Sequence, residues 1–304
     1  MDSPTSRRVG LVTGNDAPQL TDDGQAVVAE LRERGVVAEP VVWRDSTVNW
    51  SQFDAFVVRS CWNYYSDVDA FRAWLTTVER NGSVVINPAD IIRWNVHKFY
   101  LRELENAGVS VVPTAYVDSE STVDLGTLVA ENGWSEAVVK PTVGTSSDGV
   151  WRTSTPVEPA DADRFETELA AGDRLVQQFV PEITDGELSF VFFAGEFSHA
   201  NRSVPADDDF RAHPDFGVST VAVDPAAHLI EQARTALDAA ADIHSMDPAE
   251  LTYARVDGIE RDGAFELMEL ELIEPYLGLS RTDGALSRFV DAIEAALRRR
   301  CRSS

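Results

Sequence analysis

The sequence predicts an α/β protein that begins with an open, mostly parallel α/β domain and continues with two α+β parts. Three observations predict this class. Hydrophobic residues make up 44% of the 304 positions, which is enough for a buried core, and the length corresponds to about two domains of ~150 residues. Val-rich runs alternate with amphipathic helical patterns in the first part of the chain. Longer strands around short turns follow after about residue 174.

Residues 1–92 are predicted to form the open α/β domain. Asp22 and Asp23 can cap a first helix that Gly35 ends, and Asp67 can cap a second helix that Gly82 ends. Short Val-rich runs flank both helices, and the resulting β-α-β-β-α-β order is typical of a parallel sheet with crossover helices. The predicted strands cover residues 8–13, 36–43, 53–59 and 84–86.

Residues 93–174 are predicted to form a smaller α+β unit. It contains a loop of small residues at 144–149, with the sequence GTSSDG. Helical patterns cover residues 95–106 and 125–132, and Gly108 ends the first of these helices. The predicted strands cover residues 109–116, 137–141 and 150–152.

Residues 175–304 are predicted to form the third part, in which hairpins dominate. One hairpin turns at Ala194-Gly195-Glu196 and a second turns at Arg261-Asp262-Gly263. The polar, turn-rich residues 203–217 are expected to be a mobile loop. The predicted strands cover residues 188–193, 197–202, 253–259 and 265–273, and the predicted helices cover 225–241 and 284–300.

The charge pattern limits the partners of the protein. The net charge is −25, so no basic excess can neutralise nucleic-acid phosphates, and we expect no nucleic-acid partner. Lys98 and Lys140 are the only lysines among 26 basic residues, a composition that indicates a halophilic, salt-loaded cytoplasm. Two cysteines cannot form a disulfide framework, and no run of about 20 apolar residues could span a membrane.

These features predict a cytoplasmic protein without a membrane partner. The polar start, MDSPTSRR, does not have the pattern of a signal peptide. The oligomeric state stays open, and a homo-oligomer is compatible with the sequence. Several site motifs are missing, namely GxGxxG after the first strand, GxxxxGK[ST], HExxH and GxSxG.

A cluster of carboxylates is the main candidate for a metal site. Glu269 and Glu271 lie two apart in the apolar run MELELIEP, so in a strand they share one face while Leu270 and Leu272 point into a core. Antiparallel pairing around the Asp262 turn places Asp257 diagonal to Glu269 on that face. Such convergence favours a hard cation such as Mg²⁺. The alternative is a solvent-facing strand in an acid-rich protein, and Glu274 is a further candidate nearby.

Four basic residues complete a plausible nucleotide site. Lys140 ends a predicted strand just before the loop 144–149, where a lysine can reach phosphates that backbone N–H groups also contact. Lys98 lies in the first turns of a predicted helix, and Arg202 and Arg211 flank the polar loop. Together with the carboxylates, these four residues favour Mg·ATP as the ligand. The combined set is more specific than any one of its members.

The ordered motifs NxHK, VVKP, GTSSDG, QQFVPEI-x3-E, RVD and ELEL resemble those of the ATP-grasp superfamily, in particular its glutathione synthetase and RimK-type branch. The resemblance covers nearly the whole chain and implies an ATP-grasp fold with ATP between a lid and a C-terminal domain. It implies that Lys98 and Lys140 contact phosphates and that the lid loop contributes Gly144, Thr145, Ser146, Ser147 and Gly149. It implies a hinge that reads adenine, formed by Gln178, Phe179 and Val180.

The resemblance also implies that Glu187 binds the ribose and that Asp257, Glu269 and Glu271 hold Mg²⁺, with Mn²⁺ as the alternative metal. One position departs from the pattern of the branch. The metal motif usually ends in Asn, as E-x-N, whereas this chain has Glu271 there. This leaves open whether Glu271 or Glu274 completes the site.

A narrower resemblance rests on the segments VVRSCWNYYSDVDAFRAWL and ELELIEP, which are similar to the O-ureido-serine cyclo-ligases of D-cycloserine synthesis and their relatives. Arg59 and Trp62 fall at a strand end, where open α/β sheets bind ligands, so Arg59 is a candidate for a substrate carboxylate. Asp16 is a candidate for a substrate amine, with a plain surface position as the alternative. For Trp62 and Tyr64 the alternative is packing against the following helix. Cys61 is interpreted as a structural thiol.

The predicted function is ATP- and Mg-dependent ligation of a carboxylate to an amine on a small amino-acid-like substrate, through an acylphosphate. Arg202 and Arg211 are the candidates for balancing charge on the transferred phosphoryl group. Intramolecular cyclisation and the joining of two substrates both stay open. The alternatives from other classes are an ATP-binding sensor and a small-molecule kinase.

Overall fold

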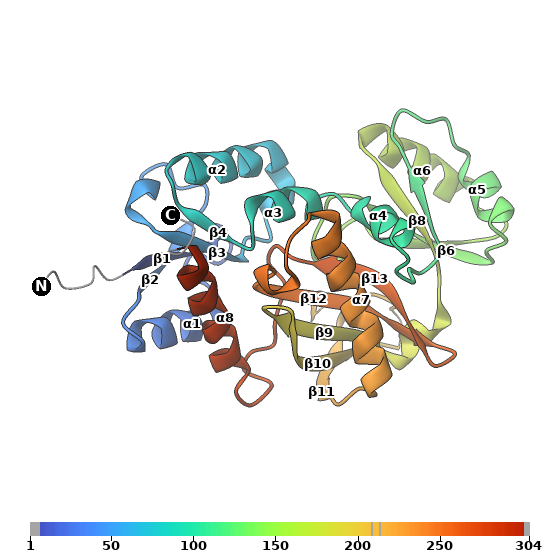
Figure 1. The fold of residues 1–304 in the computed structure, drawn as a ribbon. Coiled ribbons are helices and arrows are strands. Elements are labelled where there is room, and N and C mark those ends of the chain that lie inside the picture. Colours follow the sequence, from blue (N-terminus) through green and yellow to red (C-terminus); the bar gives the residue numbers. More distant parts are fainter. Residues whose placement is uncertain (1–6, 208, 213, 301–304) are drawn as a thin grey trace, which may run out of the picture.

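The computed structural model describes residues 7–207, 209–212 and 214–300, so the start of the predicted polar terminus, residues 1–6, lies outside it. Three sheets organise the described chain (Figure 1). The N-terminal sheet lies on the left of the view, a second four-stranded sheet at the upper right, and a five-stranded sheet between and below them. No helix in the described ranges is long and apolar enough to cross a membrane.

The N-terminal sheet confirms the predicted parallel α/β arrangement. Its strand order is β2-β1-β3-β4, and every pairing is parallel. Asp67 caps α2 as predicted, because its carboxylate accepts from the N–H of Ala70. The first cap is Thr21, which accepts from Gly24, so Asp22 and Asp23 lie in the first turn and do not cap it. The elements are β1 (Arg8–Thr13), α1 (Asp22–Glu33), β2 (Val37–Val42), β3 (Ala55–Ser60), α2 (Val68–Arg80) and β4 (Val84–Ile86).

The last helix, α8 (Ala285–Arg300), packs beside α1 under the N-terminal sheet (Figure 1). Phe289 and Ile293 of α8 are buried with Val9, Leu11 and Val57 of β1 and β3 in one apolar core. Burial of this apolar surface ties the end of the chain to its beginning.

The helix expected over 95–106 begins only at Tyr100, as α4 (Tyr100–Asn106), and a break separates it from an unpredicted helix, α3 (Ala89–Asn95). Two tertiary contacts explain the break. The side chain of Asn95 donates to Leu270 O and accepts from Leu272 N, and the backbone N–H of Lys98 donates to Thr142 O. Lys98 therefore lies in the turn between two helices and not in the first turns of one helix.

The second sheet has the antiparallel order β5-β8-β6-β7. The strand expected over 109–116 begins later, because Val112 instead donates its N–H to Leu267 O of the five-stranded sheet. The sequence patterns missed α6, and the predicted boundary after residue 174 falls within β8. The elements are β5 (Thr114–Val117), α5 (Leu125–Glu131), β6 (Glu136–Pro141), β7 (Trp151–Ser154), α6 (Pro159–Ala171) and β8 (Arg174–Gln178).

The five-stranded sheet is antiparallel, with the order β11-β10-β9-β12-β13, and α7 (Ala227–Ile243) covers one face. Both predicted hairpins are confirmed, and their two-residue turns, Ala194-Gly195 and Asp262-Gly263, have positive φ angles at all four positions. The edge strand β11 was missed, because its exposed residues show no alternating pattern. The strands are β9 (Glu187–Phe193), β10 (Glu196–Val204), β11 (Ser219–Val223), β12 (Tyr253–Arg261) and β13 (Ala264–Glu271).

The side chain of Tyr253 joins the five-stranded sheet to the N-terminal sheet. Its fully buried hydroxyl lies within 3.1 Å of the carbonyl oxygens of Val58, Ile86 and Ile273. The side chain of Asn87 adds bonds to Tyr253 O and Leu272 O. Buried polar groups that are satisfied across an interface in this way fix its geometry.

Candidate active site

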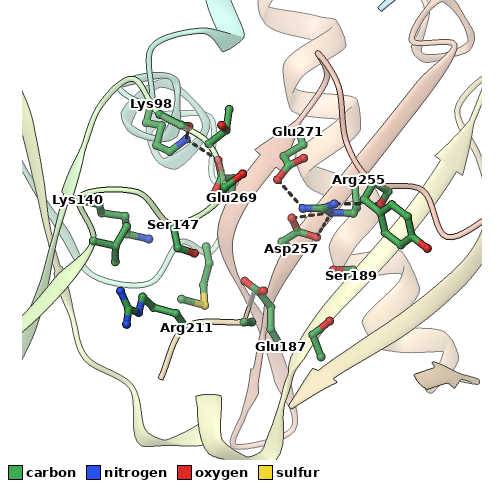
Figure 2. Close-up of a pocket in the computed structure, with 18 of the residues that line it drawn as sticks. Lys98, Lys140, Ser147, Glu187, Ser189, Arg211, Arg255, Asp257, Glu269 and Glu271 are labelled. Carbon is green, nitrogen blue, oxygen red and sulfur yellow. Dashed lines mark hydrogen bonds and ion pairs between the residues drawn. The ribbon is translucent and has the colours of Figure 1, made fainter. Parts of the chain in front are cut away.

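A cavity of about 710 Å³ lies between the second sheet and the five-stranded sheet. Its walls bring together residues from all three parts of the chain, which are far apart in the sequence. Figure 2 shows Lys140 and Ser147 on one side of it and the carboxylates of β12 and β13 on the facing sheet. The predicted residues that line it are Trp62, Lys98, Lys140, Gly144, Thr145, Ser146, Ser147, Gln178, Phe179, Val180, Glu187, Arg211, Asp257, Glu269, Glu271 and Glu274.

The carboxylates of the hairpin converge on one face, as predicted, with one correction. Asp257 lies directly opposite Glu269 in the strand register, not diagonal to it. An irregularity between Asp257 and Gly258 shifts the register and causes the difference. Leu270 and Leu272 on the other face are buried, as expected from the alternation of a strand.

Arg255 is a member of this cluster that the sequence reasoning missed. Its Nε lies 2.9 Å from both carboxylate oxygens of Asp257, and its Nη2 pairs with Glu271 (Figure 2). Its Nη1 donates to Tyr276 O at 3.0 Å. The signal was present in the motif RVD, because residues two apart in a strand share a face, so Arg255 had to accompany Asp257.

The two lysines have different partners. Lys98 Nζ lies 2.6 Å from Glu269 Oε1 and donates to Gly144 O at 3.1 Å. Burial alone would lower the pKa of Lys98, but the attraction of Glu269 and the other carboxylates outweighs it and raises the pKa. Lys140 forms no ion pair with a described residue, and burial lowers its pKa. Lys140 is therefore a half-buried cation that has no direct ion-pair partner in the described ranges.

The cavity carries a surplus of negative charge. Burial, together with repulsion from neighbouring carboxylates, raises the pKa of Glu187 to about 8 and that of Glu271 to about 7. The same causes raise the pKa of Glu274 to about 8 and that of Asp257 above its usual range. Glu269 is the exception, since the nearby cations, Lys98 first, outweigh burial and lower its pKa.

In the described ranges, no three His, Cys, Asp or Glu side chains are arranged so that they could hold a metal ion. The ion pairs explain this result, because Lys98 holds Glu269 while Arg255 holds Asp257 and Glu271. The donor set itself still fits a hard cation. Its oxygens are of the type that Mg²⁺ prefers, and the carboxylates lie together on one face of paired strands in the cavity wall.

The small-residue loop reaches over to the N-terminal sheet. Thr145 Oγ1 donates to Trp62 O at 2.9 Å. Ser146, Ser147 and Gly149 have positive φ angles between 57° and 70°, which turn the loop sharply over the cavity. Gly149 stands in the loop but does not line the cavity. The contact with Trp62 links the lid to the strand end where a substrate was expected.

The predicted adenine hinge lies at the apolar end of the cavity, where Val138, Ile183 and Met268 also line it. The N–H groups of Gln178 and Phe179 already donate to Pro113 O and Glu136 O. The ring of Phe179 lies under the guanidinium of Arg152 at 4.1 Å. The hinge thus provides a fixed apolar wall, while two of its N–H groups are used within the protein.

Besides Gly149, three predicted site residues do not line the cavity. Asp16 is exposed, and Arg202 donates to Asp185 O outside it. Arg59 is buried behind the cavity wall, donates to Pro275 O and faces the rings of Tyr253 and Phe289. It is thus placed to fix the segment that carries Glu274 and does not face the cavity itself.

Two alternatives left open by the sequence are also answered. Tyr64 stacks on Phe71 of α2 with ring centroids 5.0 Å apart, as the packing alternative predicted, while Trp62 lines the cavity. Cys61 is fully buried, and burial raises the pKa of its thiol, in agreement with a structural role. Arg211 lines the cavity but is paired with Asp209 at 2.7 Å.

Comparison with known proteins gives consistent matches over most of the chain. Residues 9–87 match the family described as "D-cycloserine synthetase DcsG, N-terminal domain". The cycloserine biosynthesis protein DcsG of Streptomyces lavendulae is 31% identical over 307 residues, which cover 95% of this chain and 99% of that protein.

Two solved structures extend the comparison. The crystal structure of D-cycloserine synthetase DcsG superposes with a TM-score of 0.85 at 30% identity, over 95% of this chain and 99% of that one. D-alanine–D-alanine ligase from Bacillus anthracis, solved in complex with ATP, has a TM-score of 0.72 at 17% identity, over 98% of this chain and 100% of that one. The second likeness concerns the fold alone.

Proposed function

The chain belongs to the DcsG family of ATP-grasp ligases, and from this premise we propose that its substrate is a small amino-acid-like molecule. Family membership confirms the predicted ATP-grasp fold and the enzyme class, an ATP-dependent carboxylate–amine ligase. One observation carries the proposal for the site. Lys98, Lys140 and the loop 144–149 line the same cavity as the carboxylates of β12 and β13.

Lys140, which forms no ion pair with a described residue, supports a role in binding the phosphates of ATP, because a half-buried ammonium without a direct acidic partner favours an anionic ligand. Lys98 would contact the phosphates as well, because the terminal phosphates of ATP would compete with Glu269 for the Lys98 ammonium. The apolar end at Phe179 and Val180 suits the adenine ring, and Glu187 suits the ribose hydroxyls.

Asp257, Glu269 and Glu271 would hold Mg²⁺, or Mn²⁺ in its place. The bound ion would neutralise and orient the phosphate oxygens. Lys98 and Arg255 would then release part of their hold on these carboxylates and become available to the phosphates. The extra charge of Glu271, where the branch has Asn, has its own counterion in Arg255.

The proposed reaction has two steps that conserve atoms and charge. A substrate carboxylate oxygen attacks the γ-phosphorus of ATP, the bond to the β,γ-bridging oxygen breaks, and ADP leaves the acylphosphate. An amine nitrogen then attacks the acyl carbon, the bond to the phosphate oxygen breaks, and the amine loses a proton as the amide forms. Arg255 and the lysines balance charge on the phosphoryl oxygens, and the lid loop excludes water from the acylphosphate.

Release of ADP tests this proposal. Purified protein in concentrated KCl with Mg·ATP is given O-ureido-serine alone, and then amino acids and dipeptides singly and in pairs. ADP from one compound with a cyclised product indicates a cyclo-ligase, and ADP only from pairs indicates an intermolecular ligase. A stable phosphorylated product would indicate a kinase, and tight ATP binding without ADP would favour a sensor.

Glu271→Gln is expected to lower kcat by roughly 100-fold or more, because the substitution removes one charged oxygen donor from the proposed metal site. The substitution should affect folding far less than turnover, so the fall in melting temperature should be small. The reason is that glutamine still fills the place beside Arg255. The measurement is ADP release as a function of Mg²⁺ concentration. If Glu271→Gln stays active with an unchanged Mg²⁺ requirement, we would assign the ligand role to Glu274 in place of Glu271.

The acidic, lysine-poor composition supports the further proposal that the protein works in a salt-loaded cytoplasm. At 1 M salt the Debye length is about 3 Å, so the self-repulsion of a chain with net charge −25 is screened. We expect the melting temperature to rise steadily between low and molar KCl. A matched titration with sucrose separates screening from general solute effects, and a flat KCl curve would contradict the proposal.

A further inference from the structure

Asn201 presents an unsatisfied amide to the cavity. It lies on β10, its side chain is 5% exposed, and its Oδ1 has no hydrogen-bond partner. In the strand register Asn201 faces Ser189, which faces Asp257, so all three lie in one row across the sheet. A buried amide without a partner costs free energy unless a ligand or water completes its hydrogen bonds.

Arg281, which is exposed to solvent, is the second group at this end of the cavity. Its Nη1 donates to Thr220 O at 2.9 Å, and its Nε lies 3.4 Å from the hydroxyl of Tyr276. Lys98, Arg211 and Arg255 each hold an acidic partner, whereas Arg281 forms no ion pair with any residue in the described ranges. A guanidinium that keeps free donors and lacks a carboxylate partner is suited to a carboxylate ligand.

Gly278 brings these two side chains together. A Cβ atom at this position would lie 3.2 Å from Asn201 Nδ2 and 3.5 Å from Arg281 Cδ, so the two groups flank bare backbone. A hydrogen bond holds the backbone next to Gly278, because His199 Nε2 donates to Leu277 O at 2.7 Å. Arg255 holds Tyr276 O in the same way. The backbone that the two groups flank is therefore held in place before any ligand arrives.

This position differs from that of the proposed phosphate site. Asn201 is two strands away from Asp257 in the same row, which corresponds to about 10 Å. Lys140 lies on the opposite wall with the lid loop (Figure 2). A ligand group at Asn201 and Arg281 would therefore lie apart from the carboxylates proposed for the metal and from Lys140.

We propose that Asn201 and Arg281 form the subsite for a carboxylate group of the amino-acid-like substrate. Arg281 supplies the charge and two parallel donors, Asn201 Nδ2 supplies a third donor, and Asn201 Oδ1 accepts from an N–H group of the same molecule. This inference rests on the proposed function for the identity of the substrate class. The carboxylate belongs either to the molecule that is activated or to a second amino acid that attacks it.

Binding of defined probes tests the subsite without turnover. The probes are D- and L-alanine, D- and L-serine and the four matched carboxamides, measured by saturation-transfer NMR on protein loaded with Mg·AMP-PNP at fixed KCl concentration. At least one amino acid should bind saturably, and its carboxamide should bind roughly tenfold or more weakly, because it lacks the charge. Binding of none of the four amino acids, or equal binding of acid and amide, would overturn the proposal.

Three variants locate the probe. Arg281→Gln and Asn201→Asp should each weaken binding of the amino acid roughly 10- to 100-fold and leave the affinity for Mg·AMP-PNP within twofold. Asn201→Asp keeps the shape of the side chain, so a melting temperature near that of the wild type excludes misfolding as the cause. Arg80→Gln removes the same charge from an exposed position on α2 and should change nothing. Full binding in Arg281→Gln would refute the assignment.

The two proposals fail in distinguishable ways. Probe binding that depends on Arg281 without ADP release would leave the subsite standing and remove the ligase substrate proposal. ADP release with a KM that is unchanged in Arg281→Gln would leave the ligase proposal standing and remove the subsite. Where turnover occurs, a KM that rises for the single compound identifies the activated molecule as the ligand, and a KM that rises for one member of a pair identifies the attacking amino acid.

Discussion

Arg255→Met is expected to lower the free energy of unfolding by about 3 kcal/mol in the presence of EDTA, because it leaves the buried Asp257 and the half-buried Glu271 beside each other without this counterion. This value is at the lower end of the usual range, since Glu271 keeps some exposure. Denaturant unfolding at constant KCl measures the change. Activity should be lost as well, because the same guanidinium is proposed to balance phosphoryl charge.

The loss of stability should depend on pH in a defined direction. Both carboxyls have pKa values raised above those of the unfolded chain, Glu271 to about 7, and removal of Arg255 raises them further. Ionisation is then costly only in the folded state, so the stability of the variant should fall as pH rises through 7 and recover in acid. Arg80→Met is the control for loss of one charge, and a loss equal in both variants would contradict the role of Arg255.

Lys140→Met is expected to weaken binding of Mg·AMP-PNP roughly 100-fold, and Lys140→Arg roughly tenfold. The first variant removes a half-buried cation that forms no ion pair with a described residue. The second keeps the charge but replaces a compact ammonium by a larger planar group in a half-buried position. Isothermal titration at fixed KCl measures both affinities.

Stability provides the control for these variants. Because desolvation disfavours the charge of Lys140, Lys140→Met should leave the ligand-free protein equally stable or more stable. A fall in affinity together with a rise or no change in melting temperature would separate binding from folding. Wild-type affinity in Lys140→Met would exclude this lysine from the phosphate site.

Local patterns predicted most of the fold because each element carries its own signal. The Val-rich strands of the N-terminal sheet and the Asp67 cap depend only on neighbouring residues, and both are confirmed. The elements that were wrong or missed depend on distant contacts. The break before α4 results from the bond between Lys98 N and Thr142 O, and the late start of β5 results from the bond between Val112 N and Leu267 O.

The candidate site shows the same division. Motif order placed Lys98, Lys140 and the carboxylates in one cavity, since a motif reflects chemistry that must converge. The predictions for Arg202 and Asp16 depended on which way loops and strand ends face, and sequence spacing does not determine this. Arg255 could have been found from strand alternation, whereas Asn201 and Arg281 meet only through the backbone of Gly278, which leaves no trace in the sequence pattern.

The pairing of β5 with β8 has a consequence for the architecture of the chain. Thr114 and Gln177 are register partners, so the polypeptide enters and leaves the second sheet at neighbouring points. The segment between them has its own apolar core, which includes Val117, Val139 and Phe165. The second sheet is thus an insertion whose two ends meet, attached to the rest by a double-stranded connection. Bending at that connection would move the whole insertion as one unit. The hydrogen bonds of the Tyr253 hydroxyl would meanwhile hold the five-stranded sheet against the N-terminal sheet.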